Sequence, residues 1–369
     1  MKNLKQNLNI NKMGGIEVGK KVVIDGPIIN YSNPQILIAI SHAHTDHANE
    51  DLIADSITTY RSVNPEVIMT HATKELLGTT LNSRTANYFK GFDYQTPYPR
   101  EGVEIQFLDA NHMLGSAQVK VVDEDLPYSI GYSGDIGRDI EKPIDVDVLV
   151  LDATYDTFFD KRTYNKEKAL KAMYKEVNNL LSEGKGFNIV AHSGLMQTVL
   201  HGLAEENPNI WIENPTVLAG APDSSPKEVR KIKHFCDVYR SYDRNIPEVI
   251  SIKDPREEDR VCMLERNPSR IALFSNIEHA QNNNHVTFTV GLTGNIQTPI
   301  QETKLGFRIS ISEHDTGDTI SKYIEGVNPE LVVIDSHRQK NIDKAEHLSS
   351  LIQEKLGIES ITSNELIDE

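Results

Sequence analysis

The stretch that decides the fold of this chain is Ser41-His42-Ala43-His44-Thr45-Asp46-His47. It places three imidazoles and one carboxylate within six consecutive positions. The run that precedes it, Ile36-Leu37-Ile38-Ala39-Ile40, is short, apolar and preceded by the breaker Asn33-Pro34, which is typical of a buried strand. The pattern therefore predicts a polar, metal-binding loop at the end of a rigid strand.

The residue types in this loop indicate which metal it suits. Neutral imidazoles and a carboxylate are ligands for zinc or another borderline divalent metal. Four donors on so short a loop do not easily converge on one ion, but they can serve two adjacent ions. His42 and His44 would then bind one ion, and Asp46 and His47 the other. A polar loop with incidental histidines is the less favoured interpretation of so dense a motif.

Composition excludes several classes of protein. With 369 residues, 38% of them hydrophobic and 25% charged, the chain fits a soluble globular protein of two domains or one elaborated domain. No apolar run approaches the ~20 residues of a membrane span, and the polar start lacks the apolar core of a signal peptide. We therefore expect a cytoplasmic protein without a membrane partner. The net charge of −16 argues against non-specific attraction of the whole surface to nucleic acid, but leaves a local basic groove open.

Hydrophobic periodicity indicates an alternation of strands and helices. Short apolar or alternating runs predict strands at residues 22–24, 103–107, 146–150, 187–191 and 331–334. Residues 164–183 instead repeat apolar side chains at helical spacing, and Gly184 is a suitable C-terminal stop. A strand at 187–191 followed by a helix at 195–203 favours a separate α/β unit in the middle of the chain.

Two further residues complete a candidate dinuclear site. His112 follows the strand at 103–107, and Asp135 follows an apolar run that ends near Tyr132. Taken alone, a histidine or aspartate after a strand is more often structural. Together with the first motif, His112 completes the ligands of the first metal, and the Asp135 carboxylate can bridge both ions.

The order and contexts of these residues resemble the metallo-β-lactamase fold, a four-layer αββα sandwich with a dinuclear site at its strand ends. Three later segments resemble the motifs of its β-CASP nuclease branch: Leu151-Asp152-Ala153-Thr154-Tyr155, Ser312-Glu313-His314-Asp315 and Asp335-Ser336-His337. The resemblance covers nearly the whole chain. It implies an α/β protein with a metallo-β-lactamase domain at 1–160 and 301–369, into which a β-CASP-like cap domain is inserted at 161–300.

The chain departs from the family pattern at two places. The segment from Ala191 to Thr198 resembles the family's Phe-Ala-x-Gly-Arg-x-Gln-Glu, but has Leu195 in place of arginine and Thr198 in place of glutamate. Loss of that arginine removes a bidentate partner for phosphate or carboxylate. In the third motif His337 falls one residue later than the family's histidine, and Ser336 occupies its place.

The resemblance implies a metal-dependent phosphodiesterase that cleaves RNA through a hydroxide activated by two Zn²⁺ ions, with Mn²⁺ as the alternative metal. The implied metal ligands are His42, His44, Asp46, His47, His112, Asp135 and His337. Asp46 would also position the attacking hydroxide. His314 would donate a proton to the leaving oxygen, and Asp152 would orient it and keep it protonated.

Other functions remain open from sequence alone. The chain could be a DNA nuclease of the same family, although a third-motif histidine goes with RNA cleavage in this branch. It could also be a hydrolase of this fold that acts on a small ester or phosphodiester, which the acidic charge favours. A non-catalytic assembly subunit is the third alternative, but the full set of ligands argues against it. RNA is the expected partner, a homodimer stays open, and the role of His192 is undecided.

Overall fold

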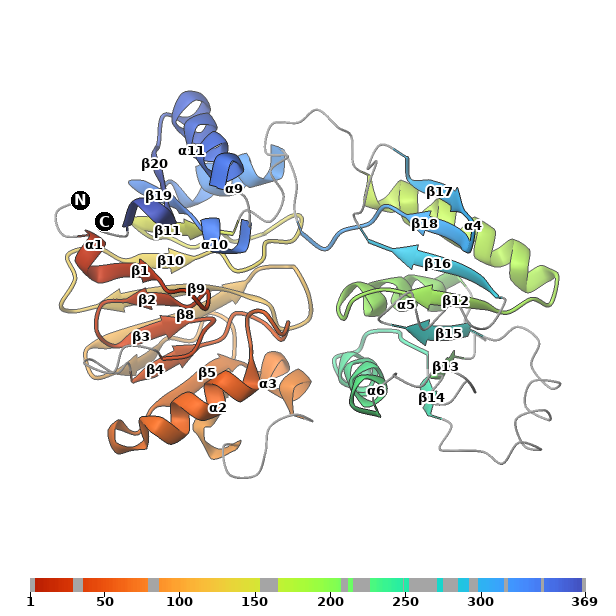
Figure 1. Cartoon of the computed structure of the whole chain (residues 1–369), viewed down its shortest axis with the longest axis horizontal. Helices are drawn as coiled ribbons and strands as arrows, with labels where there is room; N and C mark the ends of the chain where they lie inside the picture. The colour runs from red at the N-terminus through yellow and green to blue at the C-terminus, as the bar shows by residue number, and fades with distance from the viewer. Residues whose placement is uncertain are drawn as a thin grey trace. The chain divides into compact units, whose positions relative to one another are not determined.

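A computed structural model describes residues 4–28, 36–78, 86–152, 165–206, 212–214, 226–247, 249–251, 271–274, 285–291, 298–314, 318–339 and 342–366. The chain forms two compact units (Figure 1), of which one comprises Met1–Lys161 and Glu313–Glu369 and the other Arg162–Ser312. Strands and helices alternate in both units, so the predicted α/β class is confirmed.

The first unit contains two sheets. The first sheet has the order β1-β2-β3-β4-β5-β6, with the bounds Leu8–Ile10, Ile16–Val18, Val22–Ile24, Leu37–Ala39, Glu66–Thr70 and Phe89–Phe92. The second has the order β20-β19-β11-β10-β9-β8-β7, with the bounds Glu359–Thr362, Leu331–Ile334, Val148–Leu151, Ile130–Tyr132, Ala117–Asp123, Val103–Asp109 and Tyr98–Arg100. Strands β3 to β6 run parallel to one another, as do β10, β11, β19 and β20.

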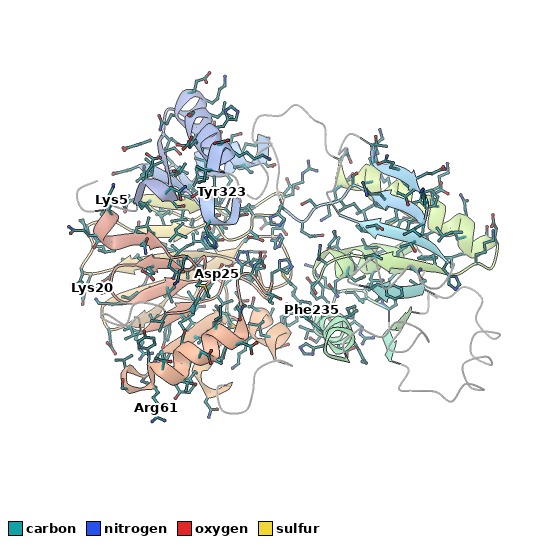
Figure 2. All side chains as sticks on the ribbon, in the orientation of Figure 1. Lys5, Lys20, Asp25, Arg61, Phe235 and Tyr323 are labelled. Carbon is teal, nitrogen blue, oxygen red and sulfur yellow. The ribbon has the colours of Figure 1, made fainter. Side chains whose placement is uncertain are left out.

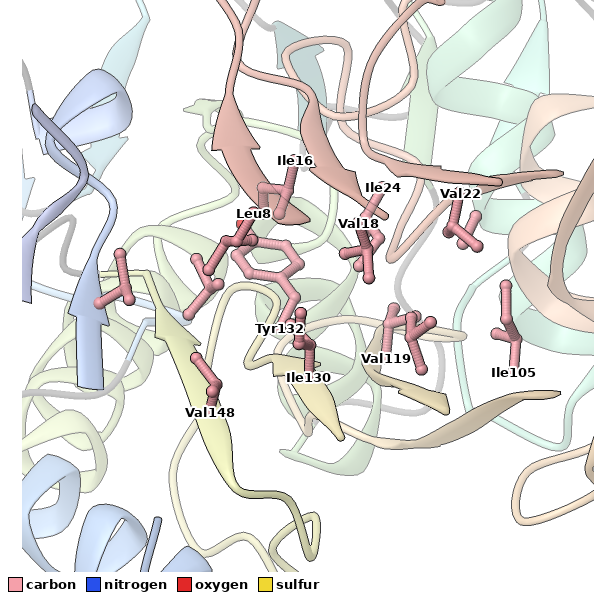
Figure 3. Close-up of a cluster of buried hydrophobic side chains, with 14 of the residues drawn as sticks. Leu8, Ile16, Val18, Val22, Ile24, Ile105, Val119, Ile130, Tyr132 and Val148 are labelled. Carbon is pink, nitrogen blue, oxygen red and sulfur yellow. The ribbon is translucent and has the colours of Figure 1, made fainter. Parts of the chain in front are cut away.

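The two sheets pack against each other through a common hydrophobic core. Alternate residues of the first sheet, such as Ile16, Val22 and Ile24, belong to the same buried cluster as Val119 and Tyr132 of the second. Figure 3 shows these side chains facing one another between the strands. Because successive side chains of a strand point to opposite faces, the remaining apolar residues of each strand face outward from this core.

Helices cover the outer face of the second sheet. A second buried cluster joins Leu149 and Val332 of this sheet to α9 (Asp318–Val327) and α11 (Ile342–Leu356). Strands β11 and β19 are therefore buried on both faces, which explains their uninterrupted Val, Leu and Ile sequences. Next to the first sheet lie α2 (Glu50–Thr59) and α3 (His71–Leu77), and α3 contacts β5 and β6. The unit is completed by α1 (Leu4–Asn7) and α10 (Ser336–Gln339).

The second unit is built on one sheet. Its order is β14-β13-β15-β12-β16-β18-β17, with the bounds Val249–Ser251, Ile212–Asn214, Ile271–Phe274, Phe187–Val190, Val286–Val290, Gly306–Ile309 and Ile300–Thr303. Among the described strands of this sheet, only β17 is antiparallel to its neighbour. The described helices of this unit are α4 (Lys166–Ser182), α5 (Leu195–Glu206) and α6 (Pro226–Ser241). Gly184, with φ 67°, follows the end of α4, as the sequence predicts.

The boundary between the units differs from the sequence prediction at one end. The predicted insertion covered 161–300, whereas the second unit extends to Ser312. The physical reason is strand pairing, because β17 pairs with β18 and β18 pairs with β16 of the second unit's sheet. Alternation within residues 307–311 shows that a strand is present there, but it does not show which sheet that strand joins.

None of the helices in the described part of the chain has the length and apolar character needed to cross a membrane.

The packing of the core between the two sheets predicts how a core substitution changes the stability of the protein. Phe107 of β8 is fully buried in that core, and a Phe107→Ala variant leaves a cavity that its neighbours cannot fill. We expect it to lose about 3–5 kcal/mol of unfolding free energy, measured by urea denaturation with circular dichroism. Val122→Ala, on the neighbouring strand at a position 40% exposed, is the control and should change the value by less than about 0.5 kcal/mol. Equal losses in the two variants would contradict the packing described here.

Candidate metal centre

The candidate site lies at one end of both sheets of the first unit. Strands β3 and β4 are parallel neighbours, so Asp25 and the loop that starts at Ser41 emerge at the same edge. Strands β8 and β10 are both antiparallel to β9, so His112 and Asp135 also follow strands that end on one side. The histidine-rich loop thus comes from one sheet, and His112 and Asp135 come from the other.

Three imidazoles and one carboxylate converge in a first cluster. His42 Nε2 lies 3.0 Å from His44 Nδ1, and His112 Nε2 lies 3.4 Å from the same nitrogen. Asp135 Oδ2 lies 3.4 Å from His42 Nε2 and 3.6 Å from His112 Nε2. The four donor atoms all lie within 4.8 Å of one another, which is a suitable spacing for ligands around a single ion.

Local hydrogen bonds explain how His112 and Asp135 are positioned. The Ser116 hydroxyl accepts from the backbone N–H of His112 and of Met113, which closes the loop after β8 into a tight turn. Gly134, directly before Asp135, has φ 61°, and a Cβ there would lie 2.5 Å from the Ala117 carbonyl oxygen. Glycine is therefore required at this turn, and the turn directs the Asp135 carboxylate into the cluster.

A buried carboxylate, Asp25, orients two of the histidines. Its oxygens accept hydrogen bonds from the backbone N–H and the hydroxyl of Ser41 and from His47 Nδ1, the last at 2.8 Å. A carboxylate can only accept, so His47 carries its proton on Nδ1 and presents the lone pair of Nε2. Ser41 Oγ gives its own hydrogen to Asp25 and lies 2.9 Å from His42 Nδ1, which therefore donates to it. Figure 2 labels Asp25 within the first unit.

This arrangement fits a bound cation. With these protonation states, the Nε2 lone pairs of His42 and His47 point toward Asp135, at 3.4 Å and 3.1 Å. A lone pair facing a carboxylate is repulsive unless positive charge lies between them. Burial lowers the pKa of His42 and His112 below the usual value for histidine, and nearby imidazoles add to the effect, so protons are poor candidates for that charge. These buried His and Asp residues could therefore hold a metal ion.

Asp135 is the electrostatic centre of the site. Burial alone would raise the pKa of its carboxyl, but the surrounding imidazoles of His47, His42 and His314 outweigh burial and hold the pKa well below its usual value. The carboxylate is therefore ionised at neutral pH. An ionised, buried group in contact with several imidazole nitrogens is typical of a metal ligand or a functional site.

In the second predicted pair of ligands, His47 is buried and Asp46 is exposed. His47 is fixed by Asp25, and its Nε2 lies 3.1 Å from Asp135 Oδ1. Asp46 Oδ2 lies 3.8 Å from the same nitrogen, and its side chain is 76% exposed. His47 thus borders Asp135 on its second oxygen, and Asp46 lies next to His47 at the exposed side of the site.

Asp152 and His314 form a pair beside Asp135. His314 Nδ1 lies 3.7 Å from Asp152 Oδ2, and His314 Nε2 lies 3.6 Å from Asp135 Oδ2. The His314 ring also contacts the His112 ring, with centroids 4.6 Å apart. Burial lowers the pKa of His314, but the two carboxylates raise it more strongly, and the net shift is upward. The structure thus brings these two predicted catalytic residues together at the cluster.

His337 is the predicted ligand that the structure does not bring into the cluster. It lies in α10 with an exposed side chain, and its backbone N–H donates to Asp335 Oδ1. Ser336 occupies the buried position instead, where it is hydrogen-bonded to Ser363 and Asn364. The buried place at the start of the short helix is therefore taken by Ser336, and the imidazole one residue later is exposed. Ala153, Thr154, Tyr155 and Asp315 of the predicted motifs lie outside the described residues.

Two buried acidic residues were not singled out as site residues from sequence. Asp25 directly follows β3, a strand in the same sheet as the histidine loop. The strand-end argument used for His112 would have found it. Asp335 follows β19 directly, and its backbone N–H donates to the Leu151 carbonyl oxygen. His192, which the sequence left undecided, is exposed in the second unit.

Comparisons with known proteins show a similar fold but indicate no activity. No protein-family model matches the chain, and no curated protein matches it in sequence. A similar solved structure is the crystal structure of a protein of unknown function from Enterococcus faecalis V583, with a TM-score of 0.57 and 11% sequence identity. The similarity covers 90% of this chain and 79% of that chain. At this identity it shows a common fold only, so any functional conclusion has to come from the residues of the site.

The role of Asp25 in orienting His47 can be tested by substitution. Asp25→Asn keeps the shape but removes the charge that fixes the proton on His47 Nδ1. Loss of such a partner typically costs 10–100-fold in metal affinity, and we expect a weakening of that order for zinc, measured by competition with a chromophoric chelator. Asp125→Asn, an exposed carboxylate far along the chain that pairs with Lys21, is the control and should leave the affinity unchanged. An unchanged affinity in Asp25→Asn would contradict the orienting role.

Proposed function

We propose that this protein is a metal-dependent phosphodiesterase of the β-CASP nuclease type and that its substrate is RNA. The observation that carries the proposal is the convergence of His42, His44, His112 and Asp135 from two sheets, with the Asp152–His314 pair beside them. Two packed sheets with helices on their outer sides, interrupted by an α/β unit, support the finer assignment as an αββα metallo-β-lactamase sandwich with a β-CASP cap.

Two zinc ions fit the donor set best, with Mn²⁺ as the alternative. One would be held by His42, His44, His112 and Asp135, and the other by Asp46, His47 and Asp135. When bound, such ions lower the pKa of water and offset the negative charge that develops on a scissile phosphate.

The remaining steps of the proposed reaction are carried out by side chains of this protein. Asp46 is exposed at the edge of the cluster, where its carboxylate can accept a hydrogen bond from the attacking water and orient it. His314 has Nδ1 beside Asp152 and Nε2 directed at the cluster, so Nε2 is the atom that gives a proton to the leaving oxygen. Asp152 acts as a positioning residue, because its negative charge favours the protonated imidazole and fixes the ring.

A small ester or phosphodiester is the second candidate substrate, and the charge distribution favours it. The first unit, which carries the site, has 36 Asp and Glu against 19 Lys and Arg, whereas the second unit has 18 against 19. A strongly acidic unit repels a long polyanion more than a small substrate with one phosphate. A DNA nuclease of the same family remains the alternative within the nucleases, since His337 does not lie in the cluster.

Substitution of His314 tests its role as proton donor. In His314→Ala we expect cleavage of single-stranded RNA to slow by about 10²–10⁴-fold, the usual contribution of general acid catalysis, while zinc content stays unchanged. A substrate whose leaving group has a low pKa needs no proton, so it should recover most of the lost rate. Loss of zinc from the variant, or no recovery with that substrate, would identify His314 as a ligand or a structural residue instead.

A competition assay decides between the candidate substrates. Matched single-stranded RNA and duplex DNA, both end-labelled, are offered together to the zinc-loaded protein, and a chromogenic phosphodiester is tested separately. We expect RNA to be cleaved faster, because a flexible single strand enters a recessed cluster more easily than a stiff duplex. Affinity should fall only shallowly with salt, since an acidic protein makes few phosphate contacts. Equal or faster cleavage of the duplex would favour the DNA nuclease, and turnover of the chromogenic ester alone would favour the small-substrate hydrolase.

A further inference from the structure

We infer that two buried threonines, Thr70 and Thr73, are positioning residues that hold the loop of His112 against the first sheet. Both hydroxyl groups donate hydrogen bonds to one carbonyl oxygen in that loop, the oxygen of Gly115. The inference rests on the proposed function, because the exact place of His112 matters only if the cluster holds a metal ion. It adds two residues that act on a ligand through the backbone and are not ligands themselves.

Both threonines lie where β5 meets α3, on the sheet opposite to the one that His112 follows. Thr70 is the last residue of β5 and the N-cap of α3, and its hydroxyl oxygen accepts a hydrogen bond from the Thr73 backbone N–H. Strand β5 is the parallel neighbour of β4, so Thr70 lies at the same edge of the sheet as the histidine loop. The cap therefore fixes both hydroxyl groups relative to the backbone of the first sheet.

The available hydrogens and lone pairs show how the Gly115 carbonyl is satisfied. Its oxygen lies 2.7 Å from Thr70 Oγ1 and 2.8 Å from Thr73 Oγ1. Each hydroxyl has one hydrogen to donate and the carbonyl oxygen has two lone pairs, so these two donors satisfy the acceptor completely. All three residues are buried, which limits the access of water to these hydrogen bonds.

The contact transmits the position of the first sheet to His112. Gly115 has φ 81°, and a Cβ there would lie 2.6 Å from the Thr73 backbone nitrogen, so the loop and the start of α3 are in close contact. The next residue, Ser116, accepts a hydrogen bond from the His112 backbone N–H. Hydrophobic packing has no direction, whereas hydrogen bonds fix distances and angles. A shift of Gly115 away from the threonines would therefore move the His112 ring relative to the histidines of the first sheet.

Substitution by valine tests the inference, because valine keeps the shape of threonine and removes the hydroxyl. Zinc affinity is measured by competition with a chromophoric chelator. In Thr73→Val the carbonyl keeps one donor, so we expect zinc binding to weaken by less than about 3-fold. The double variant Thr70→Val, Thr73→Val leaves the buried carbonyl without either donor. We expect it to weaken zinc binding by about 10-fold or more, as for the loss of an outer partner of a ligand.

The absorption spectrum of bound Co²⁺ gives a second measurement, because it reports the geometry of the ligands and not the stability of the fold. It should change in the double valine variant, since the His112 ring moves. Gly115→Ala tests the same contact from the side of the loop, because the added Cβ would overlap Thr73. This variant should also weaken zinc binding by about 10-fold or more and change the Co²⁺ spectrum.

Two controls separate positioning from a general loss of stability. Serine keeps the hydroxyl, so the double variant Thr70→Ser, Thr73→Ser should keep the zinc affinity and the Co²⁺ spectrum of the wild type. Thr287→Val removes an equally buried hydroxyl from the second unit, where Thr287 Oγ1 accepts a hydrogen bond from Asn188 Nδ2 at 3.0 Å. It should lower the stability of the protein and leave zinc binding unchanged.

The outcomes distinguish the inference from the proposed function. Zinc affinity that falls in the double valine variant and is retained in the double serine variant supports the inference. Gly115→Ala decides the question if the double valine variant does not fold. Wild-type affinity in the folded variants, or an equal loss in Thr287→Val, would overturn the inference and leave the proposed function standing. A wild-type protein that binds no zinc would overturn both.

Discussion

The site depends on one buried carboxylate. Asp135 lies 3.1 Å to 3.6 Å from the ring nitrogens of His47, His42, His112 and His314. Burial of an ionised carboxylate is costly unless positive charge is supplied beside it. Removal of any one imidazole leaves the others and their orienting groups in place, but removal of Asp135 leaves four imidazoles with no common partner. The fold has to hold this group rigidly, and it does so with a glycine turn at the end of a fully buried strand.

The packing of the two sheets sets the geometry of the site. His42, His44 and His47 belong to a loop of the first sheet, whereas His112 and Asp135 follow strands of the second. Distances between these two groups are fixed only because the sheets share one core, in which alternate residues of both interdigitate. The distance of 3.4 Å between His42 Nε2 and Asp135 Oδ2 is therefore a consequence of sheet packing. Protein interiors are packed as densely as organic crystals. A cavity in this core would therefore shift the strands, and with them the residues of the cluster.

Sequence alone was sufficient to predict the features that depend on residues close together in the chain. A dense His and Asp motif after an apolar run predicts both the strand and residues that the structure brings together in the cluster, and the α/β class follows from alternating periodicities. Features that depend on pairing between distant segments were missed. Asp25 acts on His47 only because β3 is the parallel neighbour of β4, and residues 301–312 belong to the second unit only because β18 pairs with β16. The position of His337 depends on where a four-residue helix begins, which no periodicity reveals.

The charge of the unit that carries the site limits which substrates it can attract. The unit that carries the cluster has nearly twice as many acidic as basic side chains, so its field attracts divalent cations and repels polyanions. If the substrate is a nucleic acid, as proposed, its attraction to this unit has to come from the bound ions themselves. In the proposed dinuclear site, a bound metal ion adds positive charge at the point where a phosphate would bind. In this proposal, metal occupancy and substrate affinity are coupled, and by linkage each raises the other to the same extent.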